Sequence, residues 1–255
     1  MHGRAFPWRI TNNSYEIIVS EFMLQQTQTA RVEKKYHKFL SRFPTLKKLA
    51  QSKLAEVLQV WQGLGYNRRA KFLHKTASII ETHYHGEIPD NRSDLLMLPG
   101  IGKATSGAML AFIHNKPVVF IETNIRRVYL HYFFSLSDNV HDKEIEVLIQ
   151  KTLPQKAVRQ WYYALMDYGV MLASKGENAN KKSAHYTKQS AFNGSERQIR
   201  GAILKELSFR TELEAEKMYN LLPYERYRIT NNLKKLEKEN LIVYEDGIYY
   251  LGDIR

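Results

Sequence analysis

The sequence predicts a mainly α-helical protein that ends in a small domain of three helices and a β-hairpin. Over the first two-thirds of the chain, apolar residues recur at the spacing of one helical face, and strand alternation is scarce. Near the C-terminus, an Asp-Gly pair separates two apolar runs, which is a strong hairpin signal. The length of 255 residues suggests one or two domains.

The helices of the first part are predicted in order from their apolar faces. The first four faces consist of Tyr15, Ile18, Val19, Phe22 and Met23; Val32, Tyr36, Phe39 and Leu40; Leu54, Val57, Leu58 and Trp61; and Ala70, Leu73, Ala77 and Ile80. Further helices are predicted near 93–97, 103–114, 123–134, 143–152 and 156–173. Turn residues at 43–45, 63–65, 86–89 and 99–102 separate them. Short connections of this kind are typical of an all-α domain.

The last third changes in character. A polar and basic stretch at 174–194 is predicted to be a loop or linker. The domain after it, at 195–255, is predicted to have helices at 199–207, 213–222 and 227–240 and hairpin strands at 241–244 and 248–251. Three helices followed by a hairpin are typical of a winged helix-turn-helix domain. Its third helix carries Arg226, Arg228, Lys234 and Lys235, which favours duplex DNA binding. A structural or protein-binding role is the alternative.

Composition narrows the class of function. The chain has 38 Lys and Arg against 26 Asp and Glu, a formal charge of +12, which favours a polyanionic partner and nucleic acid first. The chain has no cysteine, which excludes disulfides, cysteine nucleophiles and Cys-ligated iron–sulfur clusters. The chain has no run of about 18 apolar residues, so no membrane span is expected. Residues 1–9 have no apolar core of a signal peptide. We therefore expect a cytoplasmic, nucleoid-associated protein, or one that is otherwise intracellular, with no membrane partner.

The segment Leu98–Lys103, which reads Leu-Pro-Gly-Ile-Gly-Lys, lies between two predicted helices. Gly100 and Gly102 allow a tight turn and a close approach to a ligand. The N-terminus of the following helix and the charge of Lys103 suit a phosphate. An ordinary turn between helices is the alternative. In a chain of charge +12, we favour a helix-hairpin-helix element that grips the DNA backbone without reading its sequence.

Five segments together resemble the helix-hairpin-helix (HhH-GPD) DNA glycosylase superfamily, and in particular its MutY-type adenine DNA glycosylases. These segments are residues 6–9, 20–28, 61–66, 98–105 and 122–128. The resemblance covers about residues 4–173. It implies a six-helix lobe at about 22–130 and a second lobe formed by the N-terminus and 131–173. Thymine mismatch glycosylases of the same superfamily share the first segment and the hairpin, so they remain close competitors.

The resemblance places two carboxylates at the reaction centre. Glu21 occupies the family's general-acid position, and Glu122 stands where the family has an aspartate. Cleavage of an N-glycosidic bond needs an acid for the departing base and a carboxylate beside the electron-poor sugar. Glutamate reaches one methylene further than aspartate, so three interpretations of Glu122 stay open. The pocket has shifted to suit it, the substrate differs, or activity is weak or lost.

Further roles are implied by the same resemblance. Gln26 and Tyr66 are expected to enter the duplex as wedges during base flipping, with a core aromatic as the alternative for Tyr66. The base-pocket positions are Arg4, Trp8, Arg9, Leu24 and Asp167. The expected backbone contacts are Gly100, Gly102, Lys103, Thr105 and Arg126. The neighbouring cations Arg68, Arg69, Lys71 and Arg127 are interpreted as phosphate contacts or as solvated charge.

Two features of the family are missing from the sequence. Relatives hold a [4Fe–4S] cluster with four cysteines, whose positions fall here on Ala173, Asn180, Ser183 and Gln189. We therefore expect no iron–sulfur cluster, no metal site of side chains, and a basic loop that still contacts DNA. A monovalent cation held by hairpin carbonyls is implied by the superfamily. Adenine glycosylases also carry a C-terminal domain for 8-oxoguanine, and this tail looks like a winged helix instead.

The sequence thus predicts a monomeric, monofunctional DNA glycosylase of base excision repair. Its substrate is expected to be double-stranded DNA with a mispaired base, first adenine opposite 8-oxoguanine or guanine. Ala104 stands at the lyase-lysine position and cannot form a Schiff base, so no AP-lyase activity is expected. The alternatives are a thymine or uracil glycosylase that acts opposite guanine, and a lesion-binding protein without catalysis.

Overall fold

The computed structural model describes residues 3–176 and 178–252. Within these residues the chain forms two compact units, each built from two separate stretches of sequence. Of the described residues, unit 1 comprises those within 1–21 and 89–189, and unit 2 comprises those within 22–88 and 190–255. Residues 89–130 therefore group with the N-terminus. This division differs from the expected lobe boundary near residue 130, which stays a prediction.

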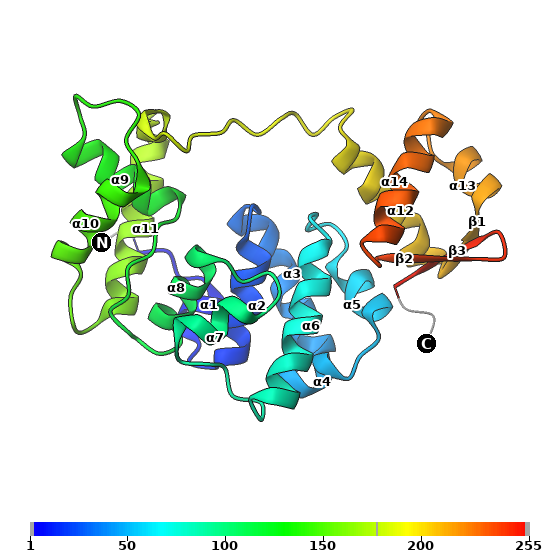
Figure 1. Ribbon diagram of the computed structural model, residues 1–255, viewed down its shortest axis with the longest axis horizontal. Helices are drawn as coiled ribbons and strands as arrows, with labels where there is room; N and C mark the ends of the chain where they lie inside the picture. The colour runs from blue at the N-terminus through cyan, green and yellow to red at the C-terminus, as the bar shows by residue number, and fades with distance from the viewer. Residues whose placement is uncertain (1–2, 177, 253–255) are drawn as a thin grey trace. The chain divides into compact units, whose positions relative to one another are not determined.

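Unit 1 is helical and contains the predicted hairpin. Its elements are α1 (Pro7–Ile10), the first part of α2 (Ser14–Leu24), α7 (Arg92–Met97), α8 (Lys103–Phe112), α9 (Thr123–Phe133), α10 (Asp142–Thr152), α11 (Val158–Ser174) and the 3-10 helix η1 (Ala179–Lys182) (Figure 1). Phe120, in the segment before α9, lies with its ring centre 4.2 Å from that of Tyr162 on α11. These rings belong to a buried core that also contains Ile17 of α2. The core therefore fixes α2, α9 and α11, which carry the candidate site, against one another.

Unit 2 combines four helices of the first part with the C-terminal domain. Its elements are α3 (Thr29–Arg42), α4 (Leu46–Ala50), α5 (Leu54–Trp61), α6 (Arg68–His83), α12 (Glu196–Arg210), β1 (Glu212–Glu214), α13 (Ala215–Leu221), α14 (Arg226–Lys238), β2 (Ile242–Glu245) and β3 (Ile248–Leu251) (Figure 1). Phe39 of α3 and Trp61 of α5 pack edge to face at 5.8 Å. The helical periodicity predicted α3, α5 and α6 because each of these helices buries one apolar stripe, and it did not predict α4.

The C-terminal strands form an antiparallel sheet in the order β1-β3-β2. Asp246 and Gly247 both have positive φ, 49° and 85°, as the predicted two-residue hairpin requires. The prediction that a helix starts at Leu213 was wrong. Glu212–Glu214 form β1, in which Leu213 pairs with Tyr249. Three residues are too short for a period to show, so the long-range pairing with β3 decides their conformation.

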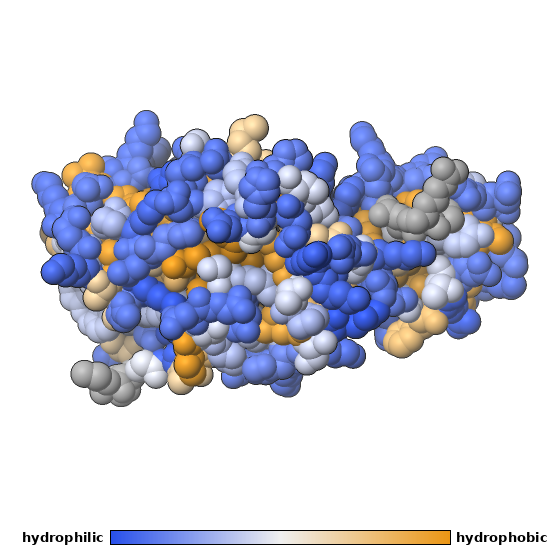
Figure 2. All heavy atoms as spheres, turned by 90° about the horizontal axis from the view of Figure 1, so that it is seen from below, coloured by the Kyte–Doolittle hydropathy of each residue, from blue (hydrophilic) through white to orange (hydrophobic). Residues whose placement is uncertain are grey.

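Hydrophilic residues cover most of the face shown in Figure 2, and apolar residues appear there in patches. This distribution accords with the 25% charged residues of the chain. Among the residues that the structure describes, none of the helices has the length and apolar character needed to cross a membrane.

Candidate active site

Two carboxyl groups of unit 1, on Glu21 and Glu122, interact with each other. Burial raises the pKa of the Glu21 carboxyl to about 8, repulsion from Glu122 acts in the same direction, and the charge of Arg9 opposes the shift. A carboxyl with such a pKa keeps its proton at neutral pH, which is the state that a general acid needs. The structure thus brings together the two carboxylates that the sequence singled out.

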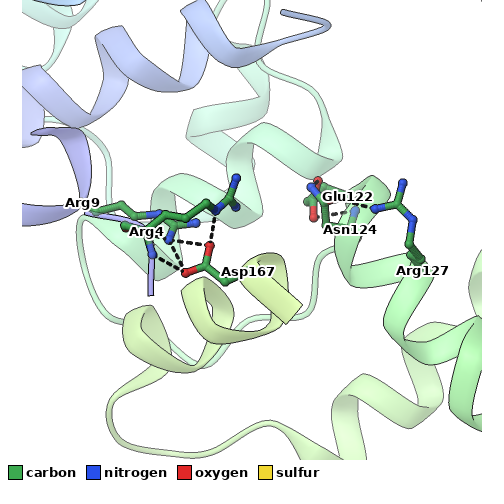
Figure 3. A network of polar contacts seen from close by, with 6 residues as sticks. All are labelled: Arg4, Arg9, Glu122, Asn124, Arg127 and Asp167. Carbon is green, nitrogen blue, oxygen red and sulfur yellow. Dashed lines mark hydrogen bonds and ion pairs between the residues drawn. The ribbon is translucent and has the colours of Figure 1, made fainter. Parts of the chain in front are cut away.

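Glu122 has a different environment, because it is the N-cap of α9. Its Oε1 accepts hydrogen bonds from the backbone N–H groups of Asn124 and Ile125, both at 2.8 Å. Nδ2 of Asn124 donates to Oε2 at 3.1 Å (Figure 3). Burial raises the pKa of Glu122, and these hydrogen bonds and the charge of Arg127 act in the opposite direction. The pKa of Glu122 is raised overall, but the bonds favour its ionised form, so of the two groups the environment suits Glu122 to the carboxylate role and Glu21 to the acid role.

Asn124 is itself held by α9 and α11. Arg127 Nη1 donates to Asn124 Oδ1 and to the backbone oxygen of Gly169, both at 2.8 Å. A Cβ on Gly169 would lie 2.3 Å from the backbone oxygen of Asn124, so only glycine permits this approach of the helices. Arg127 therefore makes internal hydrogen bonds and is not simply solvated charge. This role depends on residues 42 positions away, so no local signal predicted it.

Three predicted pocket residues form one ion-pair cluster. Asp167 Oδ1 accepts hydrogen bonds from Arg4 Nε at 2.6 Å and from Arg9 Nη1 at 2.8 Å, and its Oδ2 accepts one from the Arg4 backbone N–H at 3.0 Å (Figure 3). Burial alone would raise the pKa of Asp167, but its bonds to Arg4 and the charge of Arg9 lower the pKa overall. Asp167 is therefore ionised at neutral pH, and it joins the N-terminal segment to α11.

Aromatic rings surround the guanidinium of Arg9. It lies 5.4 Å from the ring centre of Phe6 and 4.5 Å from that of Tyr163. Trp8 stacks on Phe6 at 4.8 Å and is 4% exposed, so the expected stacking of Trp8 on a flipped base stays a prediction. The sequence did not predict that Tyr163 belongs to this cluster. The signal that could have indicated it is its position four residues before Asp167, on the same face of α11.

The predicted DNA-backbone element has an exposed helix N-terminus. Gly100 adopts φ = 80°, and Gly102 is the N-cap of α8 and offers no side chain to its first N–H groups. Gly102 and Lys103 are exposed, and Thr105 is partly buried. Arg126, also predicted to contact the backbone, forms a two-point ion pair with Asp142 through Nε at 2.8 Å and Nη2 at 2.7 Å. A phosphate contact by Arg126 would therefore compete with Asp142.

The predicted wedge residues, both in unit 2, have unusual backbone conformations. Gln26 has φ = 53° and Tyr66 has φ = 47°, in the left-handed region that non-glycine residues rarely adopt. Gln26 is exposed, and Leu24 and Tyr66 are partly buried. Strained residues persist only where the surroundings hold them, and they cluster at functional sites.

Arg69 holds both of these loops. Its Nη1 donates to the backbone oxygens of Phe22, Met23 and Gln25, and its Nη2 donates to Thr27 Oγ1 and to the backbone oxygen of Gly65. The residue is 6% exposed, and burial lowers the pKa of its guanidinium to about 10. The interpretation of Arg69 as a phosphate contact or solvated charge was wrong, because its donors satisfy the carbonyl groups at the end of α2 and before α6.

We expect Arg69→Met to lower the free energy of unfolding by about 3 kcal/mol, because it leaves several carbonyl groups without a charged donor. Urea unfolding followed by circular dichroism measures the change. Arg68→Met is the matched control, because the neighbouring side chain is 58% exposed and should change stability by less than about 0.5 kcal/mol. Equal effects of the two substitutions would contradict the assignment.

The four positions where relatives carry cluster cysteines fall on Ala173, Asn180, Ser183 and Gln189, and none of these side chains supplies a thiolate. Instead, Asn180 Nδ2 donates to the backbone oxygen of Thr123 at 3.2 Å, and Ser183 forms a β-bridge with Val140. These residues do not fit an iron–sulfur cluster. Within the residues described, no three His, Cys, Asp or Glu side chains gather as a metal site.

Lys182, one of the lysines of this loop, donates to the backbone oxygens of Phe134 and Ser135. Its amine thus joins the loop to the end of α9. The sequence predicted that this basic loop contacts DNA, and it did not predict this internal contact. Between η1 and α12 the described residues form neither helix nor strand (Figure 1).

The fold and the site define a helical protein with a helix-hairpin-helix element and two paired carboxyl groups. The profile of the HhH-GPD superfamily base excision DNA repair proteins matches residues 19–155, and the chain belongs to this superfamily. Two curated relatives are called adenine DNA glycosylase. That of Buchnera aphidicola subsp. Baizongia pistaciae is 39% identical over 176 residues, 68% of this chain and 49% of the relative. That of Mycolicibacterium smegmatis is 32% identical over 218 residues, 79% of this chain and 74% of the relative.

Among solved structures, a thermostable thymine-DNA glycosylase superimposes with a TM-score of 0.62 and 28% identity, over 70% of this chain and 84% of that chain. The chain matches adenine DNA glycosylases of three Buchnera aphidicola subspecies, and it spans about half the length of each.

Proposed function

We propose that this protein is a monofunctional DNA glycosylase of base excision repair that flips a mispaired base out of duplex DNA and hydrolyses its N-glycosidic bond. The observation that carries the proposal is the unequal environment of the two carboxyl groups: burial raises the pKa of Glu21 to about 8, whereas Glu122 accepts hydrogen bonds from two backbone N–H groups. In the reaction, the Glu21 carboxyl donates its proton to the departing base. Glu122 stabilises the positive charge that develops on the sugar as the N-glycosidic bond breaks. Water then bonds to C1′, and the proton that it loses returns to the Glu21 carboxylate.

Adenine opposite 8-oxoguanine or guanine is the proposed target, because relatives at 39% and 32% identity are called adenine DNA glycosylases. Thymine or uracil opposite guanine is the second candidate, which the similarity to a solved thymine-DNA glycosylase favours. Arg4, Arg9 and Asp167, which are bonded to one another in the structure, are proposed to contact the extruded base in either case.

The reaction is proposed to stop at the abasic site. Ala104 is exposed in the first turn of α8 and carries no amine, so no Schiff base forms there. Lys103 and the N-terminus of α8 are proposed to bind a DNA phosphate, and a monovalent cation is proposed at the hairpin carbonyls.

A panel of duplexes with one mispair each tests the proposal. Adenine opposite 8-oxoguanine, guanine or cytosine, and thymine or uracil opposite guanine, are incubated with the full chain, and the released base is identified by mass spectrometry. Strand cleavage only after alkali indicates a monofunctional enzyme. Release of thymine or uracil alone would replace the first candidate with the second. Binding without release from any duplex would leave a lesion-binding protein.

The C-terminal domain is proposed to be a winged helix that binds the duplex beside the lesion. The order of its elements, with one helix before β1 and two helices before the hairpin, supports this proposal. A hollow of about 440 Å³ in unit 2 is lined by Arg68 and Lys71 of α6, Lys235 and Lys238 of α14, and Phe72 and Glu239. Four cations against one carboxylate suit the phosphates of a DNA backbone.

We expect the double variant Lys235→Ala/Lys238→Ala to reduce the salt dependence of binding to undamaged duplex. The slope of log Kobs against log salt concentration should fall by about 0.9 for each phosphate that the variant no longer neutralises. Fluorescence anisotropy between about 50 and 200 mM salt measures it. Lys47→Ala/Lys48→Ala on α4 removes the same charge from two exposed positions as a control. Equal slopes for both variants would show that the hollow binds no phosphate.

A further inference from the structure

An arginine of the C-terminal domain contacts one of the predicted wedge residues. Arg197, in the first turn of α12, donates a hydrogen bond from Nη1 to Tyr66 Oη at 2.8 Å. Its guanidinium lies 5.9 Å from the centre of the Tyr66 ring. On the other side, Nη2 donates to the backbone oxygen of Ser190 at 2.6 Å. The guanidinium is therefore fixed from two directions.

The contact belongs to a longer seam between α12 and the segment that leads to Tyr66. Gln62 Nε2 donates to the backbone oxygen of Leu204 at 3.3 Å and to Ser208 Oγ at 2.9 Å. Arg197, Leu204 and Ser208 are separated by about two and one helical turns, so they lie on one face of α12. This face runs along the loop between α5 and α6.

A second approach of the C-terminal domain to α5 lies at the end of β3. A Cβ on Gly252 would lie 2.6 Å from the backbone nitrogen of Ala55 in α5, and Gly252 has φ = 69°. Any other residue would have to push the strand away from α5. The C-terminal domain is thus packed closely on α5 and the following loop. The contact between Arg197 and Tyr66 is one part of this packing.

Two arginines together fix Tyr66. Arg69 holds the backbone, because its Nη2 donates to the backbone oxygen of Gly65 at 3.0 Å and its Nε to that of Tyr66 at 3.4 Å. Arg197 holds the hydroxyl end of the side chain. A tyrosine side chain has only two torsions, and its hydroxyl oxygen lies on the axis of the ring, so holding the backbone and the hydroxyl fixes the direction in which the ring points.

We infer that Arg197 is a positioning residue, which holds the Tyr66 ring in the orientation that enters the duplex. The C-terminal domain then takes part in base flipping and is not only an additional DNA-binding module. This inference rests on the proposed function. Arg197 acts through Tyr66 and does not touch the reacting atoms.

A double-mutant cycle with a flipping readout tests the inference. Duplexes carry 2-aminopurine beside the mispair, whose fluorescence increases when the neighbouring nucleotide leaves the stack. Arg197→Met removes the donor, and Tyr66→Phe removes only the acceptor and keeps the ring. Each should lower the flipped fraction and the single-turnover rate by about tenfold, as expected for one hydrogen bond from a charged group. The double variant should show no further loss, and Arg197→Lys should recover part of it.

The control is Arg210→Met at the other end of α12, where the side chain is exposed and pairs with Glu206. It removes the same charge and should leave both readouts unchanged. Additive losses in the double variant would overturn the inference, as would a loss of thermal stability in Arg197→Met without a change in fluorescence. Unmutated protein that flips the nucleotide but releases no base would refute the proposed function alone. In that case, the double-mutant cycle is evaluated from the 2-aminopurine fluorescence alone. A lack of flipping by the unmutated protein overturns the inference.

Discussion

Glu21→Gln should slow base release by about a thousandfold and leave binding to mispaired duplex unchanged. Glutamine keeps the size of the side chain but has no proton of suitable pKa to give, and general acid catalysis is worth about 10²–10⁴-fold. Single-turnover kinetics with enzyme in excess measures the rate, and anisotropy with the same duplex measures binding. Glu16→Gln, earlier on α2 and partly buried, is the matched control and should leave the rate unchanged.

The pH dependence gives a second test of the same residue. The acid works only in its protonated form, and burial raises the pKa of Glu21 to about 8. On the alkaline side, the rate should therefore fall about tenfold per pH unit above about pH 8. The residual rate of Glu21→Gln should lack this fall. A descending limb that persists unchanged in the variant would assign it to another group.

The raised pKa of Glu21 also makes the free energy of unfolding decrease as the pH rises. Between the ordinary value of 4.5 and about 8, the folded state holds a proton that the unfolded state has released. The stability from this group is complete below 4.5 and is lost as the pH rises through 8. Glu21→Gln should therefore raise the melting temperature relative to the unmutated protein, by an amount that grows from pH 4.5 to 8 and then stays level. A difference that is independent of pH would contradict the burial of the carboxyl.

Local sequence predicted those parts of the site that depend on one short segment. Helical periodicity located α2 and α9, and the motifs at these helices contain Glu21 and Glu122. The roles of Arg69 and Arg197 were not predictable in this way. Arg68 and Arg69 are identical in type and adjacent in sequence, yet Arg68 is exposed and Arg69 is buried. What distinguishes them is a set of carbonyl groups at the end of α2, more than 40 residues away, which no local pattern contains.

The same limit applies to the capping by Glu122. The sequence showed a glutamate where the resemblance expects an aspartate, and it left three interpretations open. In the structure the longer side chain accepts hydrogen bonds from the N–H groups of Asn124 and Ile125, as a capping aspartate would. The additional methylene is thus accommodated at the N-terminus of α9. This geometry favours a pocket that has adapted to glutamate.

Substitutions of Glu122 separate the effect of its negative charge from the effect of its side-chain length. Glu122→Gln keeps an acceptor for the backbone N–H groups but loses the negative charge that stabilises the sugar, so base release should slow by about 10²–10⁴-fold with little change in stability. Glu122→Ala should show the same loss of rate and, because the cap is gone, unfold about 1 kcal/mol more easily. Single-turnover kinetics and urea unfolding measure the two effects. Unchanged base release in Glu122→Gln would mean that the reaction centre lies elsewhere.

Glu122→Asp is the decisive variant, because it restores the residue that the resemblance expects. If the pocket has adapted to glutamate, the shorter side chain moves the carboxylate by about 1 Å, and a displacement of that size costs up to about a hundredfold in rate. The charge and the capping hydrogen bonds remain available, so DNA binding and stability should stay near those of the unmutated protein. A rate equal to or above that of the unmutated protein would contradict the adapted pocket. Glutamate would then be a substitution that the scaffold tolerates at a loss of activity.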